Sequence, residues 1–98
     1  MKSIPKEFYL GGSKYTVELT SASQLGKTVA KIIYAKNRVI ISDNFDGDRC
    51  TPDYMEASFY HELVHGILET MGKTDLSSDE GFVEGFANLL HQFEKTKA

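Results

Sequence analysis

The hydrophobic pattern of the chain changes once, at Thr51-Pro52, and this change most constrains the fold. Before it, apolar and polar residues alternate with the period of a half-buried strand, most strictly over residues 14–20. After it, apolar residues recur at helical spacing. We therefore expect an α+β fold, with a sheet followed by helices, and the 98 residues are enough for one domain spanning 1–98.

Four segments of the first half read as strands, at residues 7–10, 14–20, 28–35 and 38–42. The connections between them are too short for crossover helices, so we expect a small, mostly antiparallel sheet of three to four strands. The next segment, residues 43–51, reads as a polar loop whose acidic residues do not have EF-hand spacing.

Two helices are expected in the second half. Thr51 can cap the first, with Pro52 at its first position, and this helix ends near Gly72. Ser77 or Ser78 can cap the second helix, which runs to about residue 93. Its apolar residues form one continuous stripe: Phe82, Val83, Phe86, Leu89, Leu90 and Phe93.

Charge and composition exclude several classes of protein. The net charge is -3, and no run of basic residues offers the stripe that a nucleic-acid partner needs. No apolar run approaches the roughly 20 residues that span a bilayer, and no apolar segment of signal-peptide length follows the N-terminus. A single cysteine, Cys50, rules out an internal disulfide. We expect a cytoplasmic protein without nucleic-acid or membrane partners.

The expected first helix contains His61-Glu62-Leu63-Val64-His65, an H-E-x-x-H motif. Residues four apart share a helix face, so the two imidazoles can bind one Zn²⁺. Glu62 is rotated by about 100° and points beside the metal, where it can take a proton from a water whose pKa the metal lowers. Without a metal, both histidines would be ordinary helix residues.

A zinc site of this type needs a third ligand. Leu68 and Met71 stand where a metzincin continuation would have Gly and His, so that option is excluded. The second helix offers Asp79, Glu80 and Glu84 instead. Two other interpretations remain open: Glu80 as a capping-box residue that reaches back to the helix start, and Glu84 as a solvated helix residue.

The segment Asp79-Glu80-Gly81-Phe82 resembles the N-E-G-F stretch of aminopeptidase N-like gluzincins, and an acidic residue four positions after the ligand is similar to the thermolysin-like pattern. The resemblance implies that Glu80 is the third zinc ligand and that Glu84 orients His61 or His65. It covers about residues 58–90. The order of sheet, motif helix and glutamate helix also resembles minigluzincins and small phage or prophage metallopeptidase-like proteins, and more distantly ImmA/IrrE-type peptidases.

Three further side chains carry groups that could take part in a site: His91, Tyr54 and Tyr60. His91 lies 11 residues after Glu80, roughly 16 Å along a helix axis, so both cannot bind one zinc ion. Tyr54 and Tyr60 lie in or beside the motif helix, and either could donate a hydrogen bond to an oxyanion.

The sequence therefore predicts a zinc-dependent metallopeptidase that acts on a peptide or protein substrate. In this interpretation His61, His65 and Glu80 hold Zn²⁺ and Glu62 is the general base. The strand at residues 38–42 would be the sheet edge that binds an extended peptide. The alternative is a catalytically weak or inactive zinc-binding regulatory or interaction protein, in which the same site is structural.

Overall fold

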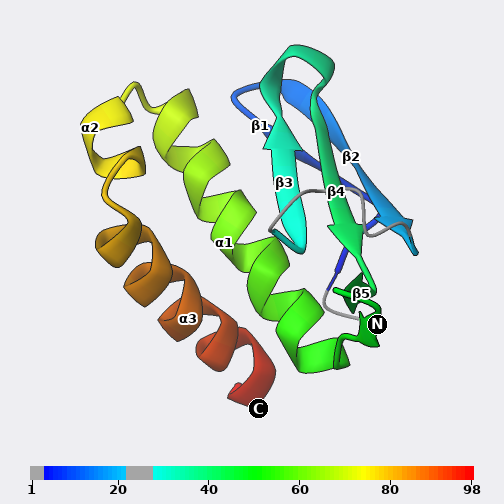
Figure 1. Ribbon diagram of the computed structural model, residues 1–98. Coiled ribbons are helices and arrows are strands. Elements are labelled where there is room, and N and C mark those ends of the chain that lie inside the picture. Colours follow the sequence, from blue (N-terminus) through cyan, green and yellow to red (C-terminus); the bar gives the residue numbers. More distant parts are fainter. Residues whose placement is uncertain (1–3, 22–27) are drawn as a thin grey trace.

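The computed structural model describes residues 4–21 and 28–98. It is a mixed α+β fold in which strands precede helices, as the change of pattern at Thr51 predicts (Figure 1). The strands are β1 (Glu7–Leu10), β2 (Ser13–Thr20), β3 (Ala30–Ile33), β4 (Arg38–Ser42), β5 (Asn44–Phe45) and β6 (Asp48–Arg49). The helices are α1 (Pro52–Thr70), α2 (Thr74–Ser77) and α3 (Glu80–Thr96).

The main sheet has the strand order β1-β2-β4-β3. The β1–β2 and β3–β4 pairs are antiparallel, which confirms the expectation of a mostly antiparallel sheet. The β2–β4 pair is parallel, with Val17 beside Val39, and this pairing was not predicted. Short connections exclude parallel pairing only between consecutive strands, whereas β3 lies within the connection between β2 and β4.

The prediction that residues 38–42 form an edge strand is wrong. β4 lies between β2 and β3, and β3 is the edge strand. A single 3₁₀ turn, Tyr34–Lys36, followed by Asn37 with a φ of 48°, reverses the chain between β3 and β4. This tight reversal brings β3 onto the side of β4 that β2 leaves free.

The segment after β4 is more ordered than the polar loop that the sequence predicts. β5 and β6 form a short antiparallel hairpin. Asp46 and Gly47 at its tip have φ values of 53° and 85°, as a two-residue turn with both residues in the left-handed region requires. The Asp-Gly pair was the sequence signal for this hairpin.

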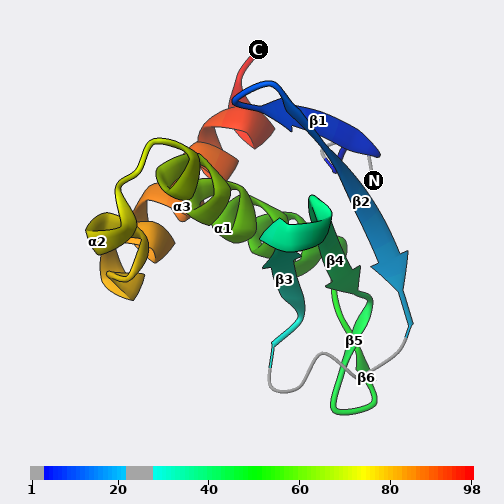
Figure 2. The same ribbon diagram turned by 90° about the horizontal axis from the view of Figure 1, so that it is seen from above.

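The molecule has three layers, with α1 between the sheet and α3 (Figure 1). Seen from above, the sheet curves around one side of α1 (Figure 2). Gly66 allows the close approach of α1 to the sheet, because a Cβ there would lie 2.9 Å from Leu10 Cδ1. The buried core joins the layers through Val39, Ile41, Met55, Phe59, Val64, Leu68, Val83 and Ala87.

The ends of α1 follow the sequence rules. The side chain of Thr51 accepts a hydrogen bond from the backbone N–H of Tyr54, and Pro52 is the first helical residue. The helix gives way at Met71 to Gly72, whose φ is +76°.

The cap of α3 differs from the prediction. Asp79 caps the helix and accepts a hydrogen bond from the backbone N–H of Phe82. Ser77 and Ser78 cannot cap it because they end α2, a one-turn helix that the sequence analysis missed. Glu80 therefore does not make the capping-box contact with Ser77 and is free to point elsewhere.

Only part of the apolar stripe predicted for the second helix is buried. Val83 and Ala87 are fully buried, whereas Phe86, Leu89 and Phe93 are exposed. α3 packs mainly on α1, with α2 near its start, so only a narrow side of α3 is covered.

Among the helices described, none combines the length and the apolar character that a membrane crossing requires.

Candidate metal centre

Three side chains converge between α1 and the start of α3. The Nε2 atoms of His61 and His65, one helical turn apart, lie 3.2 Å from each other. The carboxylate of Glu80 approaches both, with Oε2 3.2 Å from Nε2 of His61 and Oε1 3.1 Å from Nε2 of His65. Because Asp79 caps α3, Glu80 is its first residue and its side chain can reach the histidine face of α1.

The spacing of these donor atoms fits zinc. Ligand bonds of about 2.0–2.1 Å in a tetrahedral site place neighbouring donors roughly 3.3–3.4 Å apart. The two Nε2 atoms lie 3.2 Å apart, and each has one oxygen of the Glu80 carboxylate 3.1 to 3.2 Å away, within a few tenths of an ångström of that value. Two imidazole nitrogens and a carboxylate oxygen are also the donor types that zinc binds.

The other ring nitrogens of both histidines have partners. Nδ1 of His65 lies 2.9 Å from Oγ of Ser77, and Nδ1 of His61 lies 3.4 Å from Oε2 of Glu84. Such contacts fix the ring orientation and the tautomer of a metal-binding histidine. They aim both Nε2 atoms at the point where Glu80 arrives.

Glu62 occupies the space between α1 and the edge strand β3. Its carboxylate accepts a hydrogen bond from the backbone N–H of Ile32. Burial raises the pKa of Glu62 from 4.5 to about 7, although the nearby His61 and the Ile32 hydrogen bond act to lower it. A carboxyl group with this pKa can both accept and release a proton near neutral pH.

A cleft of about 260 Å³ opens beside these residues. One wall comes from the segment that leads into β3, and the other from α1 and α3. Side chains of the candidate centre, among them His61, Glu62 and Glu84, line this cleft, which is large enough for a small side chain of a ligand. The lining residues are Thr28, Val29, Ala30, Tyr54, Ala57, Ser58, His61, Glu62 and Glu84.

The two tyrosines considered as oxyanion donors are in different environments. Tyr54 lines the cleft together with Glu62. Tyr60 is buried, with its ring against Phe59 and stacked on His91. Burial raises the pKa of Tyr60. Its side chain packs between α1 and α3 through the contact with His91.

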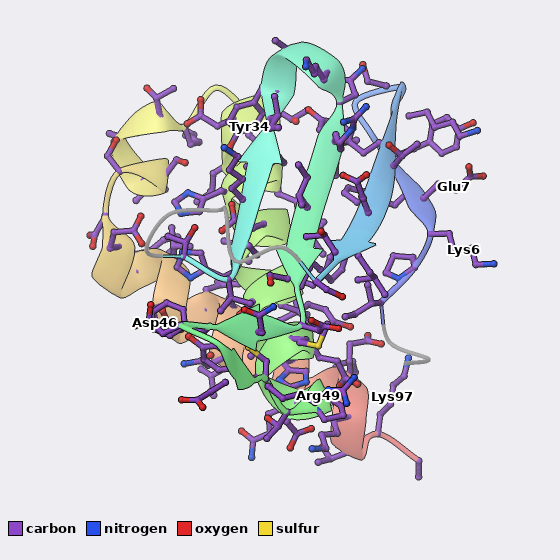
Figure 3. The ribbon with its side chains drawn as sticks, turned by 45° about the vertical axis from the view of Figure 1, so that its right-hand side comes forward. Lys6, Glu7, Tyr34, Asp46, Arg49 and Lys97 are labelled. Carbon is purple, nitrogen blue, oxygen red and sulfur yellow. The ribbon has the colours of Figure 1, made fainter. Side chains whose placement is uncertain are left out.

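Tyr34 is a residue that the sequence analysis missed. It follows β3 and lies beside the end of that strand (Figure 3). Burial, followed by the negative charges of Glu69 and Glu62, raises the pKa of Tyr34 to about 12. Its hydroxyl therefore stays protonated as a donor. No local pattern could have found it, because 28 positions separate Tyr34 from Glu62.

A second cluster of possible metal ligands, with one histidine and two acidic residues, lies at the other end of the α1–α3 pair. Asp53, Glu56 and His91 offer three donor atoms within 4.8 Å of one another. Nε2 of His91 lies 3.1 Å from Oε1 of Glu56, and the ammonium of Lys95 contacts the Asp53 carboxylate. The Lys95 contact lowers the pKa of Asp53. Because the Lys95 ammonium already pairs with Asp53, these contacts connect α1 to α3. His91 belongs to this cluster and not to the candidate metal centre.

The structure brings together His61, His65, Glu80 and Glu84, with Glu62 on the sheet side of the histidine pair. Ser77, expected only as a possible cap, joins them through His65.

Comparison of the chain with models of protein families, with curated proteins and with solved structures found no match. The function proposed below is therefore inferred from the residues of the site and their geometry.

Proposed function

We propose that this protein is a zinc-dependent metallopeptidase of gluzincin type, in which His61, His65 and Glu80 hold the metal. The observation that carries the proposal is the convergence of two imidazole nitrogens, 3.2 Å apart, and the carboxylate of Glu80, which places one oxygen 3.1 to 3.2 Å from each nitrogen, beside the half-buried carboxylate of Glu62. The substrate class is a peptide or protein.

Glu62 is the general base in this proposal. Zinc, when bound, supplies a Lewis acid that polarises a peptide carbonyl and lowers the pKa of a water. Glu62 takes the proton from the attacking water and passes it to the nitrogen of the leaving amine. Ser77 and Glu84 hold the two imidazoles in position, and Tyr54, which lines the cleft, can donate a hydrogen bond to the developing oxyanion.

The edge strand β3 replaces β4 as the proposed substrate-binding strand. Among the strands that the structure describes, only β4 pairs with β3, and Ala30 at the start of β3 lines the cleft with His61 and Glu62. An extended peptide can add to such an edge through main-chain hydrogen bonds, which would lay its scissile bond across the centre. The N–H of Ile32 already donates a hydrogen bond to Glu62, so the peptide would pair with the remaining backbone N–H and C=O groups on this edge of β3.

A structural role for zinc is the second candidate, and the packing of α3 favours it. α3 rests mainly on α1, so a metal held by residues of both helices would tie the outer layer to the rest of the fold. The position of Glu62 favours the enzyme. A purely structural centre has no use for a carboxyl group whose burial opposes its ionised form.

The Glu62→Gln variant separates the two candidates. Glutamine keeps the shape of the side chain and an oxygen that can accept from Ile32, but it cannot take up a proton. We expect wild type and variant each to bind one zinc ion per chain, with cleavage of a mixed-sequence peptide library, scored by mass spectrometry, only in the wild type. Zinc binding without cleavage by either protein would favour the structural role.

We also propose a reducing, cytoplasmic location. The only cysteine, Cys50, cannot form an internal disulfide. Burial raises the pKa of its thiol, followed by the charge of Asp43, so the thiol stays neutral and packs against the core. Cys50 is therefore not proposed as a nucleophile or a metal ligand.

A further inference from the structure

The outward side of α3 carries large apolar side chains that no described part of the chain covers. Phe82, Phe86, Leu89 and Phe93 are 37%, 51%, 68% and 60% exposed. We call these four residues the outer seam. The rings of Phe82 and Phe86 lie 6.0 Å apart between centroids, so these two seam residues are neighbours on the surface. A soluble surface rarely holds so many large apolar side chains in one line.

The residues that flank the seam are uncharged. At 100° per residue, Gly85, Gln92 and Thr96 continue the outer side of α3 beyond the seam. The charged residues within α3 lie on the other side of the helix: Glu80, Glu84, Glu94 and Lys95. A helix face made for solvent normally carries charges, so this uncharged half is unusual for an exposed surface.

The spacing of the seam identifies the shape of the partner. Steps of four, three and four residues from Phe82 to Phe93 follow the a/d pattern of two helices packed side by side. The burial pattern distinguishes this seam from the core side, where Val83 and Ala87 are fully buried against α1. The partner surface is therefore another helix.

The seam is also symmetric about its own centre, between Ala87 and Asn88. If a second α3 lies antiparallel on the first, Phe82 faces Phe93 of the second copy and Phe86 faces its Leu89. Each contact then occurs twice, as a two-fold interface requires. The antiparallel arrangement also brings the N-terminus of one helix near the C-terminus of the other, which the helix dipoles favour.

We propose that the partner is a second copy of this chain and that two molecules form an antiparallel α3–α3 homodimer through the outer seam. The exposed parts of the four side chains amount to roughly 400 Å² per copy. That is about half of the area that a standard interface buries on each side, so the dimer is expected to depend on concentration. A membrane surface is disfavoured, because the flanks lack the Lys and Arg residues that interfacial helices carry.

The proposed dimer leaves the candidate metal centre accessible. Glu80 and Glu84 lie roughly 150–170° around the helix from the middle of the seam. Dimerisation and zinc binding are therefore separate properties, and either can fail in experiment without the other.

Sedimentation velocity from low to high micromolar concentration tests the dimer. The wild type should rise from the 11.0 kDa of one chain toward twice that mass. Phe86→Lys should stay at the mass of one chain with an unchanged circular dichroism spectrum. The control is Leu19→Lys, which places the same charge at an exposed apolar position on β2 and should still dimerise. A wild type that stays monomeric, or a dimer that survives Phe86→Lys, overturns the proposal.

Two complementary variants test the orientation. Phe82→Lys and Phe93→Glu should each be monomeric alone. Mixed together, they should form a heterodimer, because the antiparallel arrangement places the new lysine against the new glutamate. A mixture that stays monomeric contradicts the antiparallel pairing. Binding of the wild type to phosphatidylcholine–phosphatidylglycerol vesicles, lost in Phe86→Lys, without any dimer would assign the seam to a membrane and overturn the proposal.

Discussion

The Nδ1 atom of His65 lies 2.9 Å from the buried hydroxyl oxygen of Ser77, and this contact joins α1 to the end of α2 behind the candidate metal centre. For Nε2 of His65 to bind a cation, Nδ1 must carry the proton, and Ser77 is the acceptor that holds it there. In the proposed centre α2 would therefore orient His65, although it supplies no proposed ligand.

Ser77→Ala should lower the zinc affinity by about 10-fold while one zinc ion per chain still binds at saturation. The reason is that His65 keeps its ligand atom but loses the partner that orients it. Competition with a chromogenic chelator measures the affinity. Ser78→Ala is the matched control, because the Ser78 hydroxyl donates a hydrogen bond to the carbonyl oxygen of Thr74 within the same helical turn. Equal affinities of the two variants would contradict the orienting role.

Glu84→Ala should also weaken zinc binding, because His61 then loses the carboxylate 3.4 Å from its Nδ1. Glu84→Gln should weaken it less, since the amide oxygen can still accept a hydrogen bond. The control is Glu94→Ala, which removes the same charge from α3 where the carboxylate contacts Lys97. If Glu94→Ala has the same effect as Glu84→Ala, only the overall charge matters.

The stability of the metal-free protein should depend on the protonation of Glu62. Because burial raises its pKa from 4.5 to about 7, the folded state binds the proton more tightly than the unfolded state. This contribution is present at low pH and is lost as the pH rises through about 7. The free energy of unfolding, measured in urea, should fall by about 2 kcal/mol more in the wild type than in Glu62→Gln between about pH 5.5 and about pH 8.

The same pH dependence in both proteins would show that Glu62 is not buried as described.

His91→Ala should destabilise the fold by about 1–3 kcal/mol, because Glu56 loses its hydrogen-bond partner and Tyr60 loses a stacked ring. Urea unfolding of the metal-free protein measures this change. Zinc stoichiometry should remain one per chain, since His91 belongs to the cluster at the other end of the helix pair. A loss of zinc in this variant would contradict the assignment of the ligands.

The sequence predicts those parts of the fold that local rules determine. Thr51 and Pro52 mark the start of α1 because capping and proline preferences act within one turn. The i, i+4 spacing of His61 and His65 places both rings on one face for the same reason.

Features that depend on distant contacts could not be read from the sequence. Strand alternation predicts β4 but not that β3 would take the edge and leave β4 in the middle of the sheet. Three neighbouring residues, Ser77, Ser78 and Asp79, can all cap a helix, and the extra turn of α2 decides in favour of Asp79. The apolar residues of α3 likewise do not say which of two sides faces α1.

The central claim is that His61, His65 and Glu80 form a zinc centre, and elemental analysis of tag-free protein tests it most directly. We expect one zinc ion per chain in the wild type and in His91→Ala, none in His61→Ala, and reduced occupancy in Glu80→Ala. A wild type without zinc even after reconstitution, or a His61→Ala variant that keeps its zinc, would contradict the account.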